Sequence, residues 1–386
     1  MGLEFSEAGE VKFDIFQIAA DIVSRAGEKP ADQVLRETFK GLRDLAPFET
    51  AEISALVFDY FRWQQWLLEE PNVQARLREA HVLATRFDTI PASFSDEELR
   101  ANAVPPWILE EVRNNEKWLR VLQGRPKLWL RARRGQGKAL AQKLGHCRPA
   151  GDGAWSDTLE FSGKEDLFRT PEFHAGEFEL QDISSQAVGL ICDPKPGETW
   201  WDACAGEGGK LLHLSDLMEN KGLIWASDRA AWRIQRLKRR TARAKAFNYR
   251  AELWDGGAKL PTKTKFNGVL LDAPCSGVGT WQRNPHARWT TTLADVKELG
   301  ALQKKLLTHA AVSLKPGGRL IYSVCTLTHS ETDDVADAFD AQFKDFKPLP
   351  MRNPLQPNAP ESARVWIWPQ DSDGNGMFVA AWEKVA

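Results

Sequence analysis

The sequence predicts an α/β protein whose carboxyl-terminal half forms a doubly wound, mostly parallel sheet. From Gly176 onward, short apolar runs alternate with segments of helical periodicity, the pattern of such sheets. A glycine-rich loop over residues 203–210 directly follows the first of these runs, where nucleotide-binding sheets hold their ligands. Two later runs each end in a cysteine, at Cys275 and at Cys325.

The composition is that of a folded, water-soluble protein with two or three domains. The chain has 386 residues, of which 42% are hydrophobic and 27% are charged. No apolar run is long enough to span a membrane and the first residues lack a signal-peptide pattern, so we expect a cytoplasmic protein without a membrane partner. Five scattered cysteines without a C-x-x-C pair disfavour disulfides and a metal site.

Residues 1–92 are predicted to form a helical domain. Apolar residues keep helical spacing over 16–23 and again over 53–61, in a segment for which Thr50 is the expected N-cap. Further helices are expected from Pro30 to Phe39 and over 73–85. The simplest interpretation of this domain is a packing or docking module without chemistry of its own.

Residues 93–175 are predicted to form a connector and then a small basic α/β subdomain. Ten Lys or Arg residues and no Asp or Glu lie between Lys117 and Arg148, and segment 127–133 alternates like a strand with one charged face. Tryptophans among these cations suit RNA, because phosphates need charge and unstacked bases need flat partners. We therefore predict that Arg131, Arg133 and Arg134 contact RNA; the alternative is a solvated basic face.

Residues 176–386 are predicted to carry the catalytic sheet. The expected strands are 199–202, 223–228, 247–253, 269–271 and 319–326, with closing strands at 365–368 and 377–382. The expected helices follow the glycine loop through Leu217 and span 230–244, a strongly cationic segment, and 293–314. A turn is expected at 315–318.

The glycine-rich loop is not a phosphate-binding P-loop, because Cys204 and Leu211 stand where that motif needs glycine and Ser or Thr. What remains is a site for a dinucleotide or an adenosyl ligand. Asp228 ends the second strand about twenty residues further on, where a ribose hydroxyl is expected. Asp255, after the third strand, is then placed to reach the adenine edge.

The two strand-end cysteines predict covalent catalysis. The carboxyl ends of parallel strands meet at one edge of the sheet, so Cys275 and Cys325 are expected to lie over the same pocket, with Asp272 beside them. Thiolates are strong nucleophiles, and a neighbouring acid provides for proton handling. The other three cysteines are interpreted as ordinary packing residues.

Several segments together resemble the Sun/NOP (RsmB-like) RNA cytosine-5 methyltransferases. These are 181–185, 202–210, 272–277, 283–285 with Trp289, and 323–326, together with the Pro-Trp pair at 106–107. The resemblance covers about residues 105–386, and the helical domain looks like the NusB-type RNA-binding domain of that family. It implies a class I S-adenosylmethionine-dependent methyltransferase fold with an antiparallel last strand, which acts on RNA as a monomer and without a metal.

The resemblance also assigns roles. It makes Cys325 the nucleophile that adds to carbon 6 of cytosine, Cys275 the residue that releases the adduct, Asp272 the group that hydrogen-bonds or protonates nitrogen 3, and Lys210 a helper that holds the base. Arg283 joins the candidate RNA-binding residues. The implied cofactor-binding residues are Cys204, Ala205, Gly206, Glu207, Gly208, Gly209, Lys210, Asp228, Asp255 and Asp272.

Three positions depart from the pattern of the family. Glu207 replaces a usual proline and adds an anion near the carboxylate of the cofactor, Val324 replaces a threonine, and Asn267 replaces an aspartate. The resemblance implies methyl transfer to carbon 5 of cytosine in RNA, with ribosomal RNA as the expected substrate and transfer RNA as an alternative. A second alternative is a catalytically idle RNA-binding factor of ribosome assembly. A DNA methyltransferase is disfavoured, because it would leave Cys325 without a role.

Overall fold

The computed structural model describes residues 13–27, 29–42, 44–113 and 115–385, and it divides into two compact units. The first unit holds Met1–Ala103 with the short segments Leu122–Gly124 and Asn284–His286. The second holds Val104–Val121, Arg125–Arg283 and Ala287–Ala386, and it contains the predicted basic subdomain and the predicted catalytic sheet. In the described part of the chain, no helix has the length and apolar character needed to cross a bilayer.

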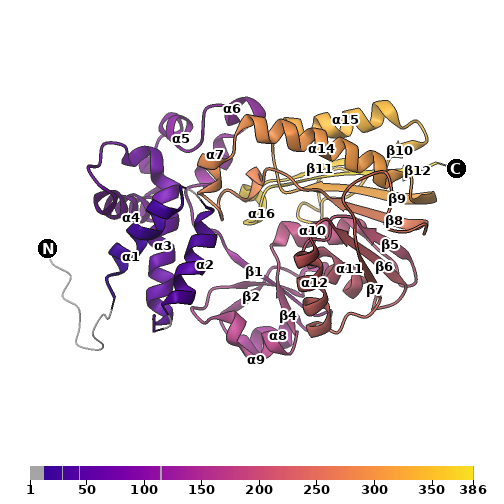
Figure 1. Cartoon of the computed structure of the whole chain (residues 1–386), viewed down its shortest axis with the longest axis horizontal. Coiled ribbons are helices and arrows are strands. Elements are labelled where there is room, and N and C mark those ends of the chain that lie inside the picture. Colours follow the sequence, from indigo (N-terminus) through magenta and orange to yellow (C-terminus); the bar gives the residue numbers. More distant parts are fainter. Residues whose placement is uncertain (1–12, 28, 43, 114, 386) are drawn as a thin grey trace. The chain divides into compact units, whose positions relative to one another are not determined.

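The first unit is built from α-helices (Figure 1). They are α1 (Ile15–Arg25), α2 (Ala31–Gly41), α3 (Pro47–Trp63), α4 (Val73–Thr89) and α5 (Asp96–Asn102). Their apolar faces meet around Trp63, which is fully buried and packs against Phe87 and Phe94 at ring-centroid distances of 5.7 and 4.9 Å. The helices predicted in this region are therefore confirmed.

Side-chain caps explain where these helices start. Asn72 Oδ1 accepts a hydrogen bond from the amide of Ala75 at 2.9 Å and so begins α4. The prediction that Thr50 is the N-cap of α3 is wrong, because the helix begins at Pro47. Proline suits a first helical position, and the carboxylate of Glu49 accepts from the amide of Ala46 at 2.7 Å, which satisfies the free end.

The second unit opens with α6 (Ile108–Glu111), α7 (Glu116–Val121) and a small antiparallel sheet of order β2-β3-β1-β4. Its elements are β1 (Leu128–Ala132), β2 (Cys147–Pro149), β3 (Thr158–Phe161), β4 (Phe178–Leu180), α8 (Gly137–Leu144) and α9 (Pro171–His174). The strand predicted near 127–133 is confirmed as β1. Its supposed charged face is buried, however: Trp129 Nε1 donates to the carbonyl of Asp373 at 2.9 Å, and Arg131 Nε donates to Gln181 at 2.6 Å.

The large sheet has the order β10-β12-β9-β8-β5-β6-β7, with β11 paired to β12. Its strands are β5 (Thr199–Asp202), β6 (Leu223–Asp228), β7 (Tyr249–Leu253), β8 (Phe266–Asp272), β9 (Leu314–Val324), β10 (Phe346–Pro348), β11 (Arg364–Ile367) and β12 (Met377–Lys384). Strands β5 to β9 run parallel, and β12 is antiparallel to β9. This arrangement confirms the predicted Rossmann-like fold, with antiparallel pairing at one edge.

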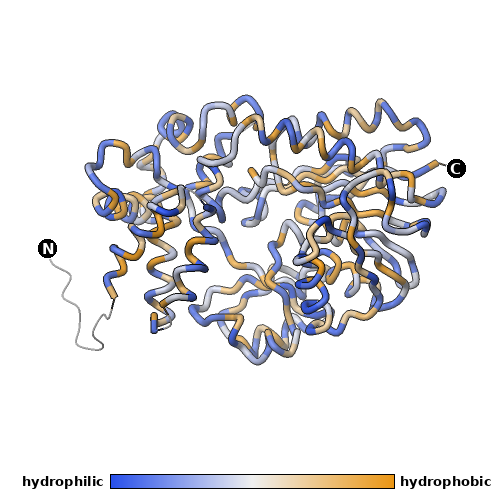
Figure 2. The backbone as a smooth tube through the Cα atoms, in the orientation of Figure 1, coloured by the Kyte–Doolittle hydropathy of each residue, from blue (hydrophilic) through white to orange (hydrophobic). Residues whose placement is uncertain are grey.

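Helices cover both faces of this sheet (Figure 1). On one face lie α14 (Leu293–Ala311) and α15 (Asp333–Gln342), and on the other α10 (Ile183–Cys192), α11 (Gly209–Leu217) and α12 (Ala231–Arg243). Successive strand residues such as Trp200 and Trp201 therefore enter opposite cores. Burial on both faces explains the apolar runs within inner strands such as β8 and β9, which are coloured as hydrophobic in Figure 2. The chain also forms the short helices α13 (Ala287–Thr290) and α16 (Pro369–Ser372).

Two details of the sheet differ from the prediction. The turn expected at 315–318 lies inside β9, because Leu314 already pairs with Phe266 before a register shift. Strand β9 also ends at Val324, one residue before Cys325, rather than at Thr326. Beyond the shift the register is regular, and it places Asp272 opposite Ser323 at the carboxyl edge.

Candidate active site

A cavity of about 400 Å³ opens at the carboxyl ends of β5, β6, β7 and β8. Residues that line it include Cys204, Ala205, Gly206, Glu207, Gly209, Lys210, Asp228, Asp255 and Asp272. These are the predicted cofactor-binding residues except Gly208, which lies within the loop as the N-cap of α11. Apolar surface is provided by Trp254, Leu302 and Leu306. The volume suits a small-molecule ligand.

The glycines of the loop allow a backbone path that other residues resist. Gly206 and Gly208 have φ angles of +54° and +86°, in the left-handed region. At Gly208 a side chain would also meet Leu237, since an added Cβ would lie 2.9 Å from Leu237 Cγ. The loop can therefore turn sharply into α11 and expose its backbone to the cavity.

Asp228 ties two loops of the cavity together. Its carboxylate accepts hydrogen bonds from the amide of Gly206 at 3.1 Å and from the amide of Ala230 at 2.8 Å. Arg233, which also lines the cavity, lies 3.6 Å from the same carboxylate. Only 5% of the Asp228 surface is exposed, so its orientation is fixed.

These features fit S-adenosylmethionine. An adenosyl ligand needs acceptors for its ribose hydroxyls, an apolar slot for adenine and anions near its cationic groups. The cavity offers Asp228 and Asp255 as acceptors, Trp254 as apolar surface and Asp272 as an anion. The extra anion at Glu207 is neutralised, because Arg236 Nη1 lies 2.6 Å from Glu207 Oε1.

The two candidate catalytic cysteines are adjacent. Cys275 follows β8 and Cys325 follows β9, and their Sγ atoms lie 3.3 Å apart as free thiols. This distance is well beyond a disulfide bond and within hydrogen-bonding reach for sulfur. The two thiols thus lie close together, as expected, but the residues that line the 400 Å³ cavity include Pro274 and neither of these two cysteines.

The two thiols differ in their electrostatics. The hydrogen bond from Cys275 lowers the pKa of Cys325 below its ordinary value, although burial and the charge of Asp272 oppose this shift. The same hydrogen bond, together with burial, raises the pKa of Cys275 well above its ordinary value. Cys325 is thus the thiol that more readily becomes a thiolate, and Cys275 holds its proton.

Asp272 forms an ion pair with Lys210. Lys210 Nζ lies 2.7 Å from Asp272 Oδ2, and Ser323 Oγ donates to Asp272 Oδ1 at 2.8 Å. Burial alone would lower the pKa of Lys210, but the charge and hydrogen bond of Asp272 raise it. Both Asp272 oxygens accept hydrogen bonds. For Asp272 to donate a proton, as expected, its pairing with Lys210 must therefore change when cytosine enters the site.

Asp202, which was not among the predicted site residues, lies fully buried at the end of β5. Burial, reinforced by the charge of Asp272, raises the pKa of Asp202 to about 8. The sequence feature that could have identified Asp202 as a site residue is its position at the start of the D-A-C-A-G segment. Arg229 and Arg233, which line the cavity, were also missed, because they looked like part of the cationic helix alone.

The structure contradicts the prediction that Arg131 contacts RNA. Only 4% of its side chain is exposed, and it forms an ion pair with Asp216 of α11. Arg133 pairs with the same carboxylate at 2.6 Å, and Arg134, which is more exposed, pairs with Glu219 at 3.0 Å. The local sequence is free of acids, but acids from another element neutralise it.

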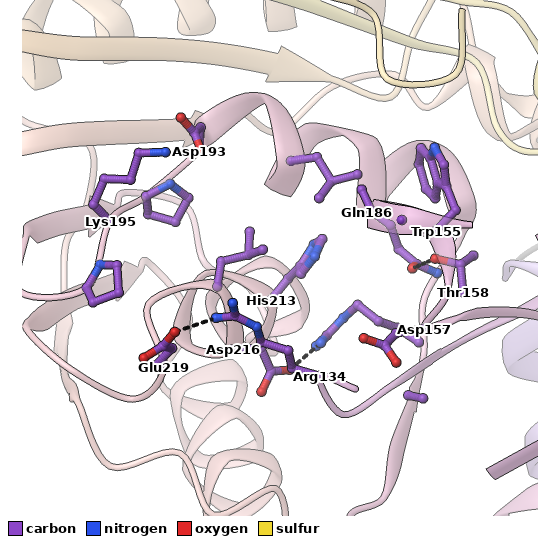
Figure 3. A pocket seen from close by; sticks show the side chains of 18 residues that line it. Arg134, Trp155, Asp157, Thr158, Gln186, Asp193, Lys195, His213, Asp216 and Glu219 are labelled. Carbon is purple, nitrogen blue, oxygen red and sulfur yellow. Dashed lines mark hydrogen bonds and ion pairs between the residues drawn. The ribbon is translucent and has the colours of Figure 1, made fainter. Parts of the chain in front are cut away.

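Arg131 and Arg134 line a second cavity of about 440 Å³, shown in Figure 3. Its lining also includes Trp155, Lys195 and His213, and Lys195 is paired with Asp193, two residues before it, at 2.6 Å. The fourth predicted RNA-binding residue, Arg283, lies elsewhere and pairs with Asp182 at 2.8 Å.

A Rossmann-like sheet with a glycine loop, an acid after the second strand and paired thiols at the carboxyl edge defines a class I methyltransferase of the two-cysteine type. Residues 189–383 match the sequence model of a family described as 16S rRNA methyltransferase RsmB/F. The chain belongs to this RsmB/F (Sun/NOP) family of S-adenosylmethionine-dependent RNA cytosine-5 methyltransferases.

Individual relatives agree with this placement. The chain is 36% identical over 233 residues to "Probable ribosomal RNA small subunit methyltransferase B" of Synechocystis sp., covering 58% of this chain and 52% of the relative. It is 36% identical over 168 residues to "tRNA (cytosine(72)-C(5))-methyltransferase NSUN6" of Mus musculus, covering 40% and 35%. The chain thus spans about half the length of the first of these relatives and less of the second.

The fold also matches a solved structure over nearly the whole chain. The crystal structure of PH0851 superposes with a TM-score of 0.79 at 24% identity, covering 97% of this chain and all of that one. At this identity the likeness concerns the fold.

Proposed function

We propose that this protein transfers a methyl group from S-adenosylmethionine to carbon 5 of cytosine in RNA through a covalent cysteine adduct. The observation that carries the proposal is the pair of thiols, Cys275 and Cys325, 3.3 Å apart beside the Lys210–Asp272 ion pair. Family membership supports the same chemistry. S-adenosylmethionine, when bound, supplies an electrophilic methyl group on a sulfonium.

Cys325 is the proposed nucleophile. Its thiolate adds to carbon 6 of cytosine, and the electron pair of the 5,6 double bond makes carbon 5 nucleophilic. The lowered pKa of Cys325 supports this role over Cys275. After carbon 5 has taken the methyl group, a base removes the carbon-5 proton, and the electron pair of that C–H bond restores the double bond and expels Cys325 as a thiolate.

Cys275 is the proposed release residue. Its raised pKa keeps it a thiol in the resting protein, within hydrogen-bonding distance of Cys325. Once the Cys325 sulfur is bonded to carbon 6, Cys275 remains close to the adduct. Its thiol can then donate a hydrogen bond to the Cys325 thiolate as that thiolate leaves. Release is therefore the step that should suffer most from its loss.

Lys210 and Asp272 are the proposed base-binding pair. Asp272 is the last residue of β8 and lies three residues before Cys275. Its side chain is 29% exposed. A cytosine that enters presents acceptors at oxygen 2 and nitrogen 3. Lys210 supplies a donor and Asp272 fixes its direction, which withdraws electrons from the ring and favours attack at carbon 6.

The cofactor is proposed to lie in the 400 Å³ cavity. Asp228 accepts from the ribose hydroxyls, and Asp255 lies near the adenine. The glycine loop approaches the ligand with its backbone. Arg236 pairs with the carboxylate of Glu207 and so neutralises an anion at the cavity.

The RNA surface is proposed to be the exposed face of α12 rather than β1. The segment from Arg229 to Ala251 has nine Lys or Arg residues and no acid. Trp232 of α12 is 52% exposed, and the Arg233 and Arg236 guanidinium carbons lie 5.2 and 5.0 Å from its ring. In the described part of the chain, Lys238 and Arg239 are exposed without an ion-pair partner. Unpaired cations on the same helix as an exposed ring suit phosphates and an unstacked base.

Ribosomal RNA of the small subunit is the proposed substrate, because the family description and the cyanobacterial relative both name it. Transfer RNA is the alternative, since the mouse relative is named for it.

The deciding experiment incubates the protein with radiolabelled S-adenosylmethionine and, separately, small-subunit ribosomal RNA and transfer RNA. Bisulfite sequencing then locates the product. We expect transfer to one cytosine of the ribosomal RNA and none in Cys325→Ala. Cofactor binding without transfer to either RNA would instead indicate a catalytically idle RNA-binding factor.

A further inference from the structure

Each candidate catalytic cysteine is followed by a residue with a hydroxyl group, and both hydroxyls meet at one carboxylate. Ser276 follows Cys275 and Thr326 follows Cys325. The amide of Ser276 donates to Glu331 Oε1 at 2.9 Å, and its hydroxyl donates to Glu331 Oε2. The hydroxyl of Thr326 lies 3.1 Å from the same Oε2 atom and 3.0 Å from the hydroxyl of Ser276.

Glu331 has no exposed surface. It receives two further donors, from Thr328 Oγ1 at 2.8 Å and from Gln303 Nε2 at 3.0 Å. A buried carboxylate is expensive unless its oxygens are satisfied, and here both are. These hydrogen bonds therefore fix the position of Glu331 and of the groups that donate to it.

A second connection joins the same loops behind Glu331. Gln303 of α14 donates to the carbonyl of Pro274, the residue before Cys275, at 2.9 Å. The hydroxyl of Tyr322 lies 2.9 Å from Gln303 Oε1 and 2.7 Å from the carbonyl of Glu331. The loop after β8 is thus anchored on both sides of its cysteine.

We propose that Glu331 is a positioning residue that clamps the loops of Cys275 and Cys325 together, so that the two sulfurs stay in hydrogen-bonding contact. It holds the two loops chiefly through its hydrogen bonds from Ser276 and Thr326. The consequence for catalysis rests on the function proposed above; the clamp itself rests on the contacts alone.

A clamp and a simple charge effect predict opposite results. The negative charge of Glu331 raises the pKa of both thiols, so removing the charge alone should lower the pKa of Cys325 and speed its alkylation. Release of the loops should instead break the hydrogen bond from Cys275. That bond is the main cause of the lowered pKa of Cys325, so its loss should slow alkylation near neutral pH.

The test replaces Glu331 with Gln, which keeps the shape but offers one acceptor oxygen where two are used. Iodoacetamide labelling of Cys325 is followed across a pH series by mass spectrometry of its peptide. We expect the midpoint to move to higher pH and the rate near neutrality to fall several-fold. Faster or unchanged labelling would overturn the clamp. Labelling requires no RNA, so the test stands even if the proposed function fails.

Steady-state kinetics provide the second readout. A loosened pair of nucleophile and release residue should lower kcat by about tenfold or more, with the KM for RNA within about twofold of wild type. Equal kcat in Glu331→Gln and wild type would also overturn the proposal.

Milder variants decide the matter if Glu331→Gln fails to fold, as judged by thermal unfolding. Ser276→Ala and Thr326→Val each free one loop and should each slow the labelling of Cys325. Thr328→Val is the matched control, because it removes a donor from the same carboxylate oxygen without adjoining a cysteine. Equal loss in all three variants would show a general packing role and overturn the clamp.

Discussion

Arg236 of α12 and Glu207 of the glycine loop form an ion pair, with Arg236 Nη1 2.6 Å from Glu207 Oε1. The sequence raised Glu207 as an added anion beside the cofactor, and the pair explains how that anion is accommodated. The same helix therefore pairs with the glycine loop through Arg236 and, in our proposal, contacts RNA through its unpaired cations Lys238 and Arg239.

The ion pair makes the first prediction. Arg236→Ala leaves Glu207 unpaired next to the cofactor carboxylate, so the affinity for S-adenosylmethionine should fall by up to about fivefold, a small effect because the pair is exposed. Calorimetry without RNA measures it. The double variant with Glu207→Ala should return to nearly wild-type affinity; tighter binding by Arg236→Ala alone would contradict the assignment.

Asp228 makes the second prediction. Loss of a charge-assisted hydrogen bond costs about 1.5–3 kcal/mol, so Asp228→Ala should weaken S-adenosylmethionine binding about ten- to a hundredfold. Because Asp228 also holds the amides of Gly206 and Ala230, thermal unfolding must first show that the variant is folded. Asp193→Ala, at an exposed acid outside the cavity, is the control. Unchanged affinity in folded Asp228→Ala would refute the placement.

The roles of the two cysteines make the third prediction. Cys325→Ala should be inactive and form no covalent protein–RNA species. Cys275→Ala should still attack but release slowly, so a species that survives denaturing electrophoresis should accumulate and vanish in the double variant. An adduct in Cys325→Ala but not in Cys275→Ala would reverse the two roles.

The sulfur–sulfur hydrogen bond makes the fourth prediction, on pH. Cys275 donates to Cys325 and so stabilises its thiolate, which lowers the pKa of Cys325. Alkylation of Cys325 should therefore rise with pH through a midpoint below that of a free thiol in the wild type. In Cys275→Ala the midpoint should move to higher pH, so less thiolate is present near neutrality. A midpoint that moves to lower pH would mean that Cys275 raises the pKa of Cys325 by shielding it from water more than it lowers that pKa by its hydrogen bond.

The exposed face of α12 makes the fifth prediction. Replacing Lys238 and Arg239 with Gln should reduce the slope of log affinity for RNA against log salt by about two. Lys304 and Lys305, two exposed lysines on α14 across the sheet, provide the matched control. If both double variants change the slope equally, the attraction is diffuse and α12 is not the docking surface.

Local patterns predicted the sheet and much of the site. Apolar runs located β5, β6 and β8, because residues buried on both faces leave no polar alternation, and strand ends then located Asp228, Cys275 and Cys325. What failed depended on partners distant in sequence. Arg131 looked like a surface cation because Asp216, which neutralises it, lies 85 residues further along the chain.

Glu331 was not among the predicted site residues for a related reason. An acid six residues after Cys325, among polar neighbours, resembles any loop residue. Its meaning comes from Ser276, which lies 55 positions away and is brought within hydrogen-bonding distance only by the pairing of β8 with β9. The helix start at Pro47 likewise depended on the reach of Glu49, which spacing alone does not reveal.

The pairing of Asp272 with Ser323 places the site on two strands from the interior of the sheet. β8 and β9 have neighbours on both edges and helices on both faces, so they belong to the segments that open last in native-state fluctuations. The distance between the two sulfurs is therefore set by the cooperative core rather than by mobile loops alone. As denaturant is added, the contact between the two sulfurs should persist until the core unfolds. Loss of this contact and unfolding of the core should therefore have the same midpoint.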